Sequence, residues 1–369
     1  MPTGTPELET ATLQKLFASG GVAQPGLYRL IRHIEYPLKK GPPIILDGCR
    51  IEWLEPEKGY DWGWAICSAG MALPGQPRSE GVELNFGKTG RLILPKNNIK
   101  GHRKGIGITN TDNANLINTR IESPLRDGYT DDLSFALQIH NSNNIHIKGG
   151  LLAVRSNREG ADGIHGTGTC SGLTAIELET QSGDDATSLT SENSNYQNAV
   201  LEDWFFQNCS LNNYGHSVIK GLILPRMGNL TTIRRWTFKD CDLKTTLTNS
   251  GQGAPIWIVN QGGVIEGISI LGGKLRVREA LAGKPSGAMI YLRGVDRFTM
   301  LNTAIEHNTR TLMDAENCQD LSFKPRSVLP AVLIGAQLKP TPFLMLNSCF
   351  GSDVDITKIP PSYKGQKVL

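Results

Sequence analysis

Short stretches of alternating apolar and polar residues run through most of this chain, and glycine or asparagine corners separate them. Such alternation is typical of β-strands that bury one face, whereas long patterns with helical periodicity are almost absent. One phrase recurs from about Lys100 onward: a polar or glycine corner, a small residue and then alternating apolar positions. The phrase begins at Asn113, Asn143, Ser171, Asn198, Asn229, Val264, Val295 and Gln319.

The recurrence has a short and variable period of roughly 30 residues. A period of this kind is typical of a solenoid whose turns keep their strands and lengthen their loops. Asparagines at the corners tolerate left-handed backbone, and the Ile, Val, Leu and Phe positions face inward. The sequence therefore predicts an all-β parallel β-helix without an internal domain boundary.

The first residues differ from this pattern, because their apolar positions recur with helical spacing between Pro6 and Phe17. The positions that share one helical face are Leu8, Leu13, Leu16 and Phe17. Pro6 suits a first turn, and Gly20-Gly21 ends the helix. We expect a short N-terminal helix that caps the open end of the solenoid. The predicted organisation is a cap helix and first strand at 1–35, a β-helix at 36–345 and a tail at 346–369.

Composition and charge narrow the classes of function. The 369 residues include 41 glycines and 20 prolines, as in a β-rich chain with many corners. A net charge of +3, without a basic run that interleaves aromatics, argues against a nucleic-acid partner. No apolar run reaches the length of a spanning helix, and the first residues lack the regions of an export signal. We expect no insertion into a membrane.

The seven cysteines are widely spread, and none stands in a C-x-x-C pair. An odd number without ligand spacing argues against a zinc site and a disulfide framework, so we expect no metal and no cofactor. Cys209 and Cys241 end similar apolar phrases. We expect them to be small buried residues on adjacent turns.

Candidate catalytic residues gather between Phe135 and Lys220. They stand in the groups Ala161-Asp162-Gly163, Gly183-Asp184-Asp185 and Gly215-His216-Ser217. Asp184 follows Asp162 by 22 residues, about one turn of the solenoid, so we expect these carboxyl groups to stack. Like charges this close raise one pKa, which prepares a general acid beside a general base. A lone Gly-Asp-Asp is usually a turn, but with Asp162 and His216 it becomes a catalytic candidate.

These groups, together with the line that begins Leu137-Gln-Ile-His-Asn-Ser-Asn-Asn, resemble the polygalacturonases. That family, the family 28 glycoside hydrolases, belongs to the pectin-lyase-like right-handed β-helices. Its signatures are Asn-Thr-Asp, Gly/Gln-Asp-Asp, Gly-His-Gly and Arg-Ile-Lys, in this order. The close match spans about 85 residues of this chain. The resemblance implies a right-handed single-stranded β-helix that hydrolyses glycosidic bonds.

The resemblance also implies roles for four residues. Asp184 is the general acid that protonates the leaving glycosidic oxygen, while Asp162 and Asp185 hold and activate the attacking water. His216 lies beside them and tunes their protonation. The family inverts the anomeric centre, which requires carboxyl groups about 6.5 to 9.5 Å apart.

Three signatures depart from the family pattern. The first reads Gly160-Ala161-Asp162, the third ends in Ser217, and the stretch where Arg-Ile-Lys belongs reads Pro255-Ile256-Trp257-Ile258. The missing cations bind the substrate carboxylate in pectin-degrading members, so galacturonan is a doubtful substrate. Trp257 offers an apolar platform for a sugar instead.

Further residues are candidates for binding substrate. The set that we expect to bind is His165, Trp257, Lys220 and Arg293. The missing charge could come from Arg226, Arg234, Arg235 or Arg293, although each alone is more often a solvated surface residue.

Several other groups have a structural interpretation beside a functional one. The aromatics Tyr60, Trp62 and Trp64 can stack on sugars or pack against their own turn. Asp131-Asp132 can bind calcium, but a solvated loop is the favoured interpretation. His140 and His146 stand in strand phrases, and we expect both to face outward.

Two alternatives to a hydrolase stay open. A calcium-dependent polysaccharide lyase on the same fold would abstract a proton next to a uronate and leave unsaturated ends. A non-catalytic glycan-binding β-helix would keep the acids without cleavage. The chain also resembles phage tailspike or depolymerase β-helices, which are homotrimers that act on bacterial surface glycans. This implies a polysaccharide partner, a homotrimer as one assembly, and an extracellular or virion location.

Overall fold

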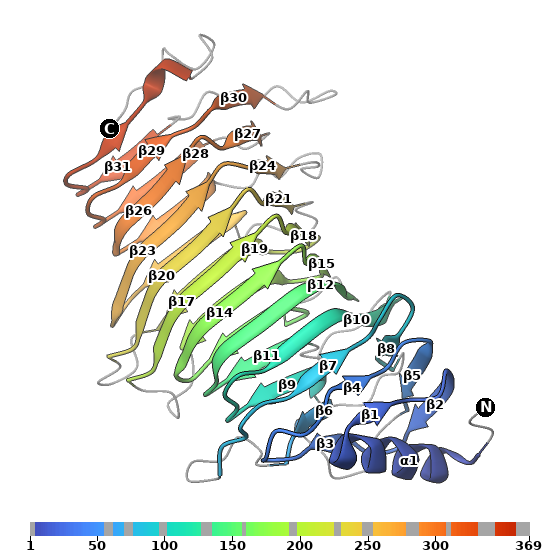
Figure 1. Ribbon diagram of the computed structural model, residues 1–369. Helices are drawn as coiled ribbons and strands as arrows, with labels where there is room; N and C mark the ends of the chain where they lie inside the picture. The colour runs from blue at the N-terminus through green and yellow to red at the C-terminus, as the bar shows by residue number, and fades with distance from the viewer. Residues whose placement is uncertain are drawn as a thin grey trace. The chain divides into compact units, whose positions relative to one another are not determined.

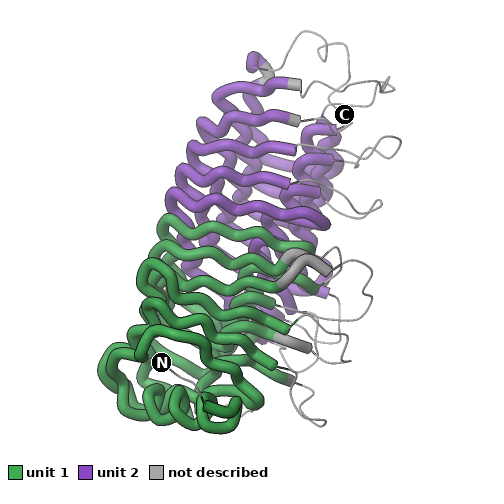
Figure 2. Tube along the Cα trace, turned by 90° about the vertical axis from the view of Figure 1, so that its right-hand side faces the viewer, with its two compact units in different colours: residues 1–184 green, residues 185–369 purple. Residues whose placement is uncertain are grey.

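The structure is a computed structural model that describes residues 4–54, 62–69, 77–95, 102–126, 135–156, 160–191, 198–224, 230–245, 254–277, 288–307, 311–330 and 344–358. Two compact units make up the chain, residues 1–184 and 185–369 (Figure 2). Parallel β-strands wind into a solenoid in both units, and one helix begins the chain (Figure 1). The predicted all-β parallel β-helix is therefore confirmed. The predicted boundaries after residues 35 and 345 stay predictions.

The described strands of the first unit form three parallel stacks. The first stack contains β1 (Gly21–Val22), β4 (Ile44–Ile45), β7 (Glu83–Asn85), β10 (Asn115–Arg126), β12 (Asn143–Ser156) and β14 (Cys170–Ile176). The second contains β2 (Gly26–Leu30), β5 (Cys49–Trp53), β8 (Arg91–Ile93), the later parts of β10 and β12, and β15 (Glu179–Ser182). The third contains β3 (Ile34–Tyr36), β6 (Trp62–Ser68), β9 (His102–Thr109), β11 (Leu137–His140) and β13 (Ile164–Thr167).

The described strands of the second unit repeat this arrangement. The first stack contains β17 (Val200–Gln207), β20 (Thr232–Lys239), β23 (Val264–Leu271), β26 (Val295–Leu301), β29 (Ser322–Lys324) and β32 (Asp353–Val354). The second contains β18 (Ser210–Asn213), β21 (Asp242–Thr245), β24 (Lys274–Val277), β27 (Ala304–His307) and β30 (Ser327–Pro330). The third contains β16 (Asp185–Ser191), β19 (Ser217–Ile223), β22 (Ile256–Asn260), β25 (Ala288–Arg293), β28 (Thr311–Glu316) and β31 (Leu344–Asn347), and the short 3-10 helix η2 (Ile356–Lys358) follows β32.

The core consists of ladders of similar side chains, because each strand pairs in register with the next turn. In the second unit, Trp204 pairs with Trp236 and Phe206 pairs with Phe238. The two phenylalanine rings are stacked with their centroids 4.9 Å apart. Cys209 and Cys241 are buried just after the ends of β17 and β20, and all seven cysteines are free thiols. The expected role of these cysteines as small core residues is confirmed.

Asparagines with left-handed backbone form many of the corners. Asn113 has φ 62° and Asn144 has φ 56°, and the two lie at the same corner of successive turns. The side-chain amide of Asn144 donates a hydrogen bond to Oδ1 of Asn113 at 3.3 Å. Because asparagine tolerates this backbone and its amide can bond to the amide of the next turn, the corners stack as the sequence predicted.

The helix α1 (Pro6–Ser19) packs against β2 and β3, and Leu13 and Phe17 are buried there. The predicted apolar face is wrong at Leu8, which is 61% exposed. Instead, the buried carboxylate of Glu9 forms an ion pair with Arg29 of β2 at 2.9 Å. The buried face of the helix thus consists of Glu9, Thr10, Leu13 and Phe17, and Leu8 lies outside it.

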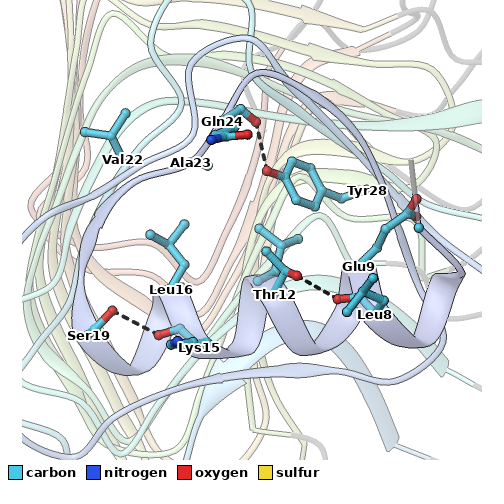
Figure 3. Close-up of a pocket in the computed structure, with 12 residues that line it drawn as sticks. Leu8, Glu9, Thr12, Lys15, Leu16, Ser19, Val22, Ala23, Gln24 and Tyr28 are labelled. Atoms are coloured by element: carbon cyan, nitrogen blue, oxygen red, sulfur yellow. Dashed lines mark hydrogen bonds between the residues drawn. The ribbon is translucent and has the colours of Figure 1, made fainter. Parts of the chain in front are cut away.

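A cavity of about 590 Å³ lies between α1 and the strands β1 and β2 (Figure 3). Leu8, Leu16 and Val22 line it, and Tyr28 donates a hydrogen bond to the backbone carbonyl of Gln24 beside it. None of the candidate catalytic residues lines this cavity. Among the described residues, no helix has the length and apolarity to cross a bilayer.

A substitution at Gly150 can test how closely β10 and β12 approach each other in the first unit. Its φ is 107°, and a Cβ at this position would lie 2.3 Å from the carbonyl oxygen of Thr119 on the paired strand. We expect Gly150→Ala to lower the free energy of unfolding by about 2 to 4 kcal/mol, because the added carbon forces β10 and β12 apart. Urea denaturation measures the change.

Gly41→Ala is the matched control, because no atom lies within 4 Å of a Cβ at Gly41. We expect a change of less than about 0.5 kcal/mol for this variant. Equal losses for the two variants would contradict the close approach at Gly150.

Candidate functional site

Asp162 and His165 form a close pair in the first unit. Asp162 lies just before β13 and His165 lies within it, and Nδ1 of His165 is 2.5 Å from Oδ2 of Asp162. The imidazole also stacks on the ring of Phe135, with centroids 4.1 Å apart and planes 9° apart. The carboxylate of Asp162 is buried. His165 is therefore held by an acid at its edge and by an aromatic ring at its face.

Asp184 lies against the chain segment that carries Asp162. The backbone N–H of Gly160 donates to Oδ2 of Asp184 at 2.5 Å. The N–H groups of Gly183 and Asp184 both donate to the carbonyl of Ala161 at 3.1 Å. The two turns predicted to stack are thus in direct hydrogen-bonded contact. Both carboxyl groups are buried.

A buried lysine that the sequence analysis missed lies in the same stack of strands. The Nζ of Lys104 donates to Oε1 of Gln138 at 2.7 Å and lies 4.9 and 5.0 Å from the ring centroids of Trp64 and Phe135. Burial lowers the pKa of Lys104 to about 8. Alternation alone does not find this residue: Lys104 alternates with Ile106 and Ile108, which predicts the inward face, but its partner Gln138 pairs with Gly107, on the opposite face from Ile106.

Of the two interpretations of Trp64, stacking on a sugar or packing within the protein, the structure supports packing. Its side chain is buried, and its Nε1–H donates to Oε1 of Gln138 at 3.2 Å. It packs against neighbouring turns and offers no open platform for a sugar. Tyr60 and the side chain of Trp62 lie outside the described residues, as do Asp131 and Asp132.

The expectation that His140 faces outward is wrong. His140 is 2% exposed, and its Nδ1 lies 3.0 Å from Oγ1 of Thr167. Burial, together with the charge of Lys104, lowers the pKa of His140 to about 4, so the ring is neutral near pH 7. All four residues of β11 are buried, and for this reason strand alternation misassigned His140. His146 is exposed, as expected.

In the second unit, Asp185 accepts contacts from three groups. Nδ1 of His216 lies 3.2 Å from Oδ1, the backbone N–H of Ser217 donates to Oδ1 at 3.1 Å, and Nζ of Lys220 lies 3.0 Å from Oδ2. The pairing of Asp185 with Ser217 across β16 and β19 positions all three donors. Burial acts to raise the pKa of Asp185, but Lys220 and His216 outweigh it and hold the pKa below its usual range. Asp185 is therefore an ionised, buried carboxylate near pH 7.

Trp257 continues this cluster on the next turn. It pairs with Lys220 across β19 and β22, and its ring lies edge-on to His216 with centroids 5.6 Å apart. The Nζ of Lys220 lies 5.9 Å from the centroid of the Trp257 ring. His216, Lys220 and Trp257, which the sequence singled out separately, thus lie together beside Asp185.

The arginines proposed to replace the missing cations are bound elsewhere. Arg293 forms ion pairs with Asp314 at 3.0 Å and Glu316 at 3.1 Å. Arg234 and Arg235 lie on β20, in a different stack of strands from Asp185, and bind the acids of β17. Arg226 lies outside the described residues.

The groups around Asp185 affect whether a metal ion could bind to its carboxylate. A carboxylate and an imidazole are common metal ligands, but the ammonium group of Lys220 already supplies positive charge to Oδ2 of Asp185. Lys220 therefore disfavours a second cation at Oδ2 of Asp185. The chemistry that both clusters offer is proton transfer and charge stabilisation by carboxylate and imidazole groups.

Comparisons with known proteins give neighbours in structure only. No family model matches the sequence, and no curated protein matches it. A family 28 exopolygalacturonase from Yersinia enterocolitica has a TM-score of 0.49 and 10% identity, over 90% of this chain and 72% of that chain.

Two further solved structures resemble this chain at lower TM-scores. An endo-xylogalacturonan hydrolase from Aspergillus tubingensis has a TM-score of 0.41 and 10% identity, over 96% of this chain and 93% of that chain. The tailspike protein of Dettilon has a TM-score of 0.32 and 11% identity, over 93% of this chain and 62% of that chain. Structural neighbours thus include a family 28 exopolygalacturonase, an endo-xylogalacturonan hydrolase and a tailspike.

Lys220→Met tests the buried pair at Asp185. Removing one partner of a buried ion pair leaves an uncompensated charge, so we expect the free energy of unfolding at pH 7 to fall by about 3 to 5 kcal/mol. The folded pKa of Asp185 lies below its unfolded value, so its stabilisation is present above about pH 4 and is lost as the pH falls through the folded pKa. The difference between variant and wild type should therefore narrow in acid, as measured by urea denaturation across this range.

Arg297→Met is the control, because Arg297 pairs with Glu266 on the same unit and is 59% exposed. We expect a loss of about 1 kcal/mol or less. A loss for Lys220→Met as small as that of the control would contradict the buried pair.

Lys104→Met tests the buried lysine in the first unit. The folded pKa of Lys104 lies near 8, below its unfolded value near 10.5, so the unfolded chain binds more protons between these pH values. The free energy of unfolding of the wild type, relative to Lys104→Met, should rise by up to about 3 kcal/mol between pH 8 and 10.5. Lys148→Met, at an exposed position of β12, should give no such rise. A flat difference for Lys104→Met would refute the lowered pKa.

Proposed function

We propose that the protein is a glycoside hydrolase that cleaves a polysaccharide, with Asp162, Asp184, Asp185 and His216 as its catalytic residues. One observation supports this most strongly. Two buried carboxylates, each paired with a histidine, stand in the chain on either side of Asp184. Buried ionisable groups cost free energy, and such groups with strong partners gather at functional sites.

The environment of Asp185 supports a role as a fixed anion. Its oxygens accept contacts from His216, Ser217 and Lys220, and its lowered pKa makes it a poor acceptor for a proton at neutral pH. In the proposed mechanism it orients His216 and helps to hold the attacking water. Asp162, bound by His165, takes a proton from that water.

The bond changes of the proposed reaction are those of hydrolysis. The water oxygen attacks the anomeric carbon while Asp162 accepts the water proton, and Asp184 gives its proton to the leaving glycosidic oxygen. The glycosidic bond breaks and a hemiacetal of inverted configuration forms, provided that about 6.5 to 9.5 Å separates the acid and the base. The homotrimer and the extracellular or virion location stay predictions of the same resemblance.

Asp184→Asn tests the proposed acid. The wild type is incubated with a panel of neutral and acidic polysaccharides, and new reducing ends are measured together with ultraviolet absorbance. We expect reducing ends without absorbance, and a loss of rate by about 10²- to 10⁴-fold in Asp184→Asn, because the leaving oxygen loses its proton donor. Asp203→Asn, at an exposed acid that pairs with Arg235 on another stack, should keep the wild-type rate.

The outcomes separate the alternatives. Absorbing ends whose release stops in chelator would identify a calcium-dependent lyase. Binding of a glycan by the wild type without any cleavage would identify a non-catalytic binding protein. Equal rates for wild type and Asp184→Asn would exclude Asp184 as the acid.

A further inference from the structure

A shallow cavity in the second unit has the composition of a sugar site. Its volume is about 440 Å³, within the usual range for small-ligand sites. It lies along β22, β25 and β28. The residues that line it include Trp257, Gln261, Tyr291, Arg293 and Glu316.

Aromatic rings form one part of the cavity wall. Trp257 and Tyr291 are register partners on adjacent strands, so their backbones lie about 4.8 Å apart and their side chains project on the same face. The guanidinium carbon of Arg293 lies 3.9 Å from the centroid of the Tyr291 ring. This contact fixes the Tyr291 ring. Fixed aromatic rings present flat apolar area to the C–H face of a sugar at little cost in entropy.

The charge of Arg293 is matched within the protein itself. Nη1 of Arg293 lies 3.0 Å from Oδ1 of Asp314, and Nε lies 3.1 Å from Oε2 of Glu316. One cation therefore faces two carboxylates, of which Glu316 lines the cavity, so the charge of Arg293 is already neutralised by the protein. A third carboxylate, from a uronic acid, would meet like charge at short range.

Hydrogen-bonding groups for hydroxyls are still present. Within the described part of the chain, Nη2 of Arg293 has no hydrogen-bond partner, and Gln261 is exposed at the rim. A donor on a planar guanidinium and an amide can bind hydroxyl groups without any net charge on the ligand.

We propose that this cavity binds an uncharged sugar unit of the substrate and disfavours a uronic acid. The proposal rests on the proposed function, because it makes the cavity a subsite of that enzyme. It also changes the role expected for Arg293: the guanidinium holds Tyr291 and donates to a hydroxyl, and it does not replace the missing cations for a substrate carboxylate. Neutral glycans, rather than pectin-like ones, are the substrate class.

Binding to the Asp184→Asn variant tests this subsite apart from cleavage. The probes are dextran, xylan and mannan as neutral glycans, and polygalacturonate and alginate as acidic ones, with tryptophan fluorescence and affinity electrophoresis as the readouts. We expect binding of at least one neutral glycan and weaker binding of both acidic ones. Trp257→Ala in the same background should weaken the neutral glycan by about tenfold, whereas Trp257→Phe, which keeps a ring, should weaken it less.

Glu316→Gln tests the source of the discrimination. Removing this carboxylate leaves Arg293 less neutralised, so we expect affinity for polygalacturonate to rise by roughly threefold while affinity for the neutral glycan stays unchanged. Glu266→Gln, at an acid paired with Arg297 on another stack, should change neither.

The results that overturn the subsite differ from those that overturn the hydrolase. Tighter binding of an acidic glycan than of every neutral one, binding of no neutral glycan, or neutral binding that Trp257→Ala leaves intact would refute the subsite. Binding that depends on Trp257, together with no cleavage by the wild type, would keep the subsite and refute the hydrolase.

Discussion

In-register pairing between successive turns is the constraint on which the rest of this structure depends. Within each unit, a residue's neighbours above and below lie at the same position of the adjacent turns, about 4.8 Å away. Trp204 therefore meets Trp236, and Asn113 meets Asn144. Groups distant in sequence become close in space without any tertiary packing of separate elements, and this is how Asp184 comes against Ala161.

The same constraint explains the treatment of charge. A buried side chain in a solenoid has few directions from which a partner can approach, and the adjacent turn is the nearest. Lys104 finds Gln138 one turn on, and Asp185 finds Lys220 and His216 one turn on. Each charged group is thereby held in a fixed place by residues that its own strand position selects. Fixed placement of this kind is what general acid–base chemistry requires of its carboxylates.

Much of this structure could be predicted from the sequence, because period-two alternation and left-handed corners are local properties. The solenoid and the paired turns of Asp162 and Asp184 followed from them, and the cap helix followed from the helical spacing of apolar residues near the N-terminus. The exposure of Leu8, the burial of His140 and the ion pairs of Arg293 did not follow, because each depends on contacts between residues distant in the sequence. Next to Leu8, Glu9 binds Arg29. His140 contacts Thr167, and Arg293 binds Asp314 and Glu316. Ion pairs between turns leave no periodic trace in sequence, so the charge balance at Arg293 needed coordinates.

The stacked asparagine and glycine corners also decide where this chain tolerates change in length, because their turn-to-turn contacts leave no room for an extra residue. Extra residues elsewhere between two strands only lengthen a loop, since the strands on both sides keep their pairing with the turns above and below. A single residue inserted into a strand would instead exchange the inward and outward faces of everything up to the next corner. Variation among chains of this design should therefore concentrate in loop lengths, which leaves the inherited ladders intact while the surface that meets a ligand is remade.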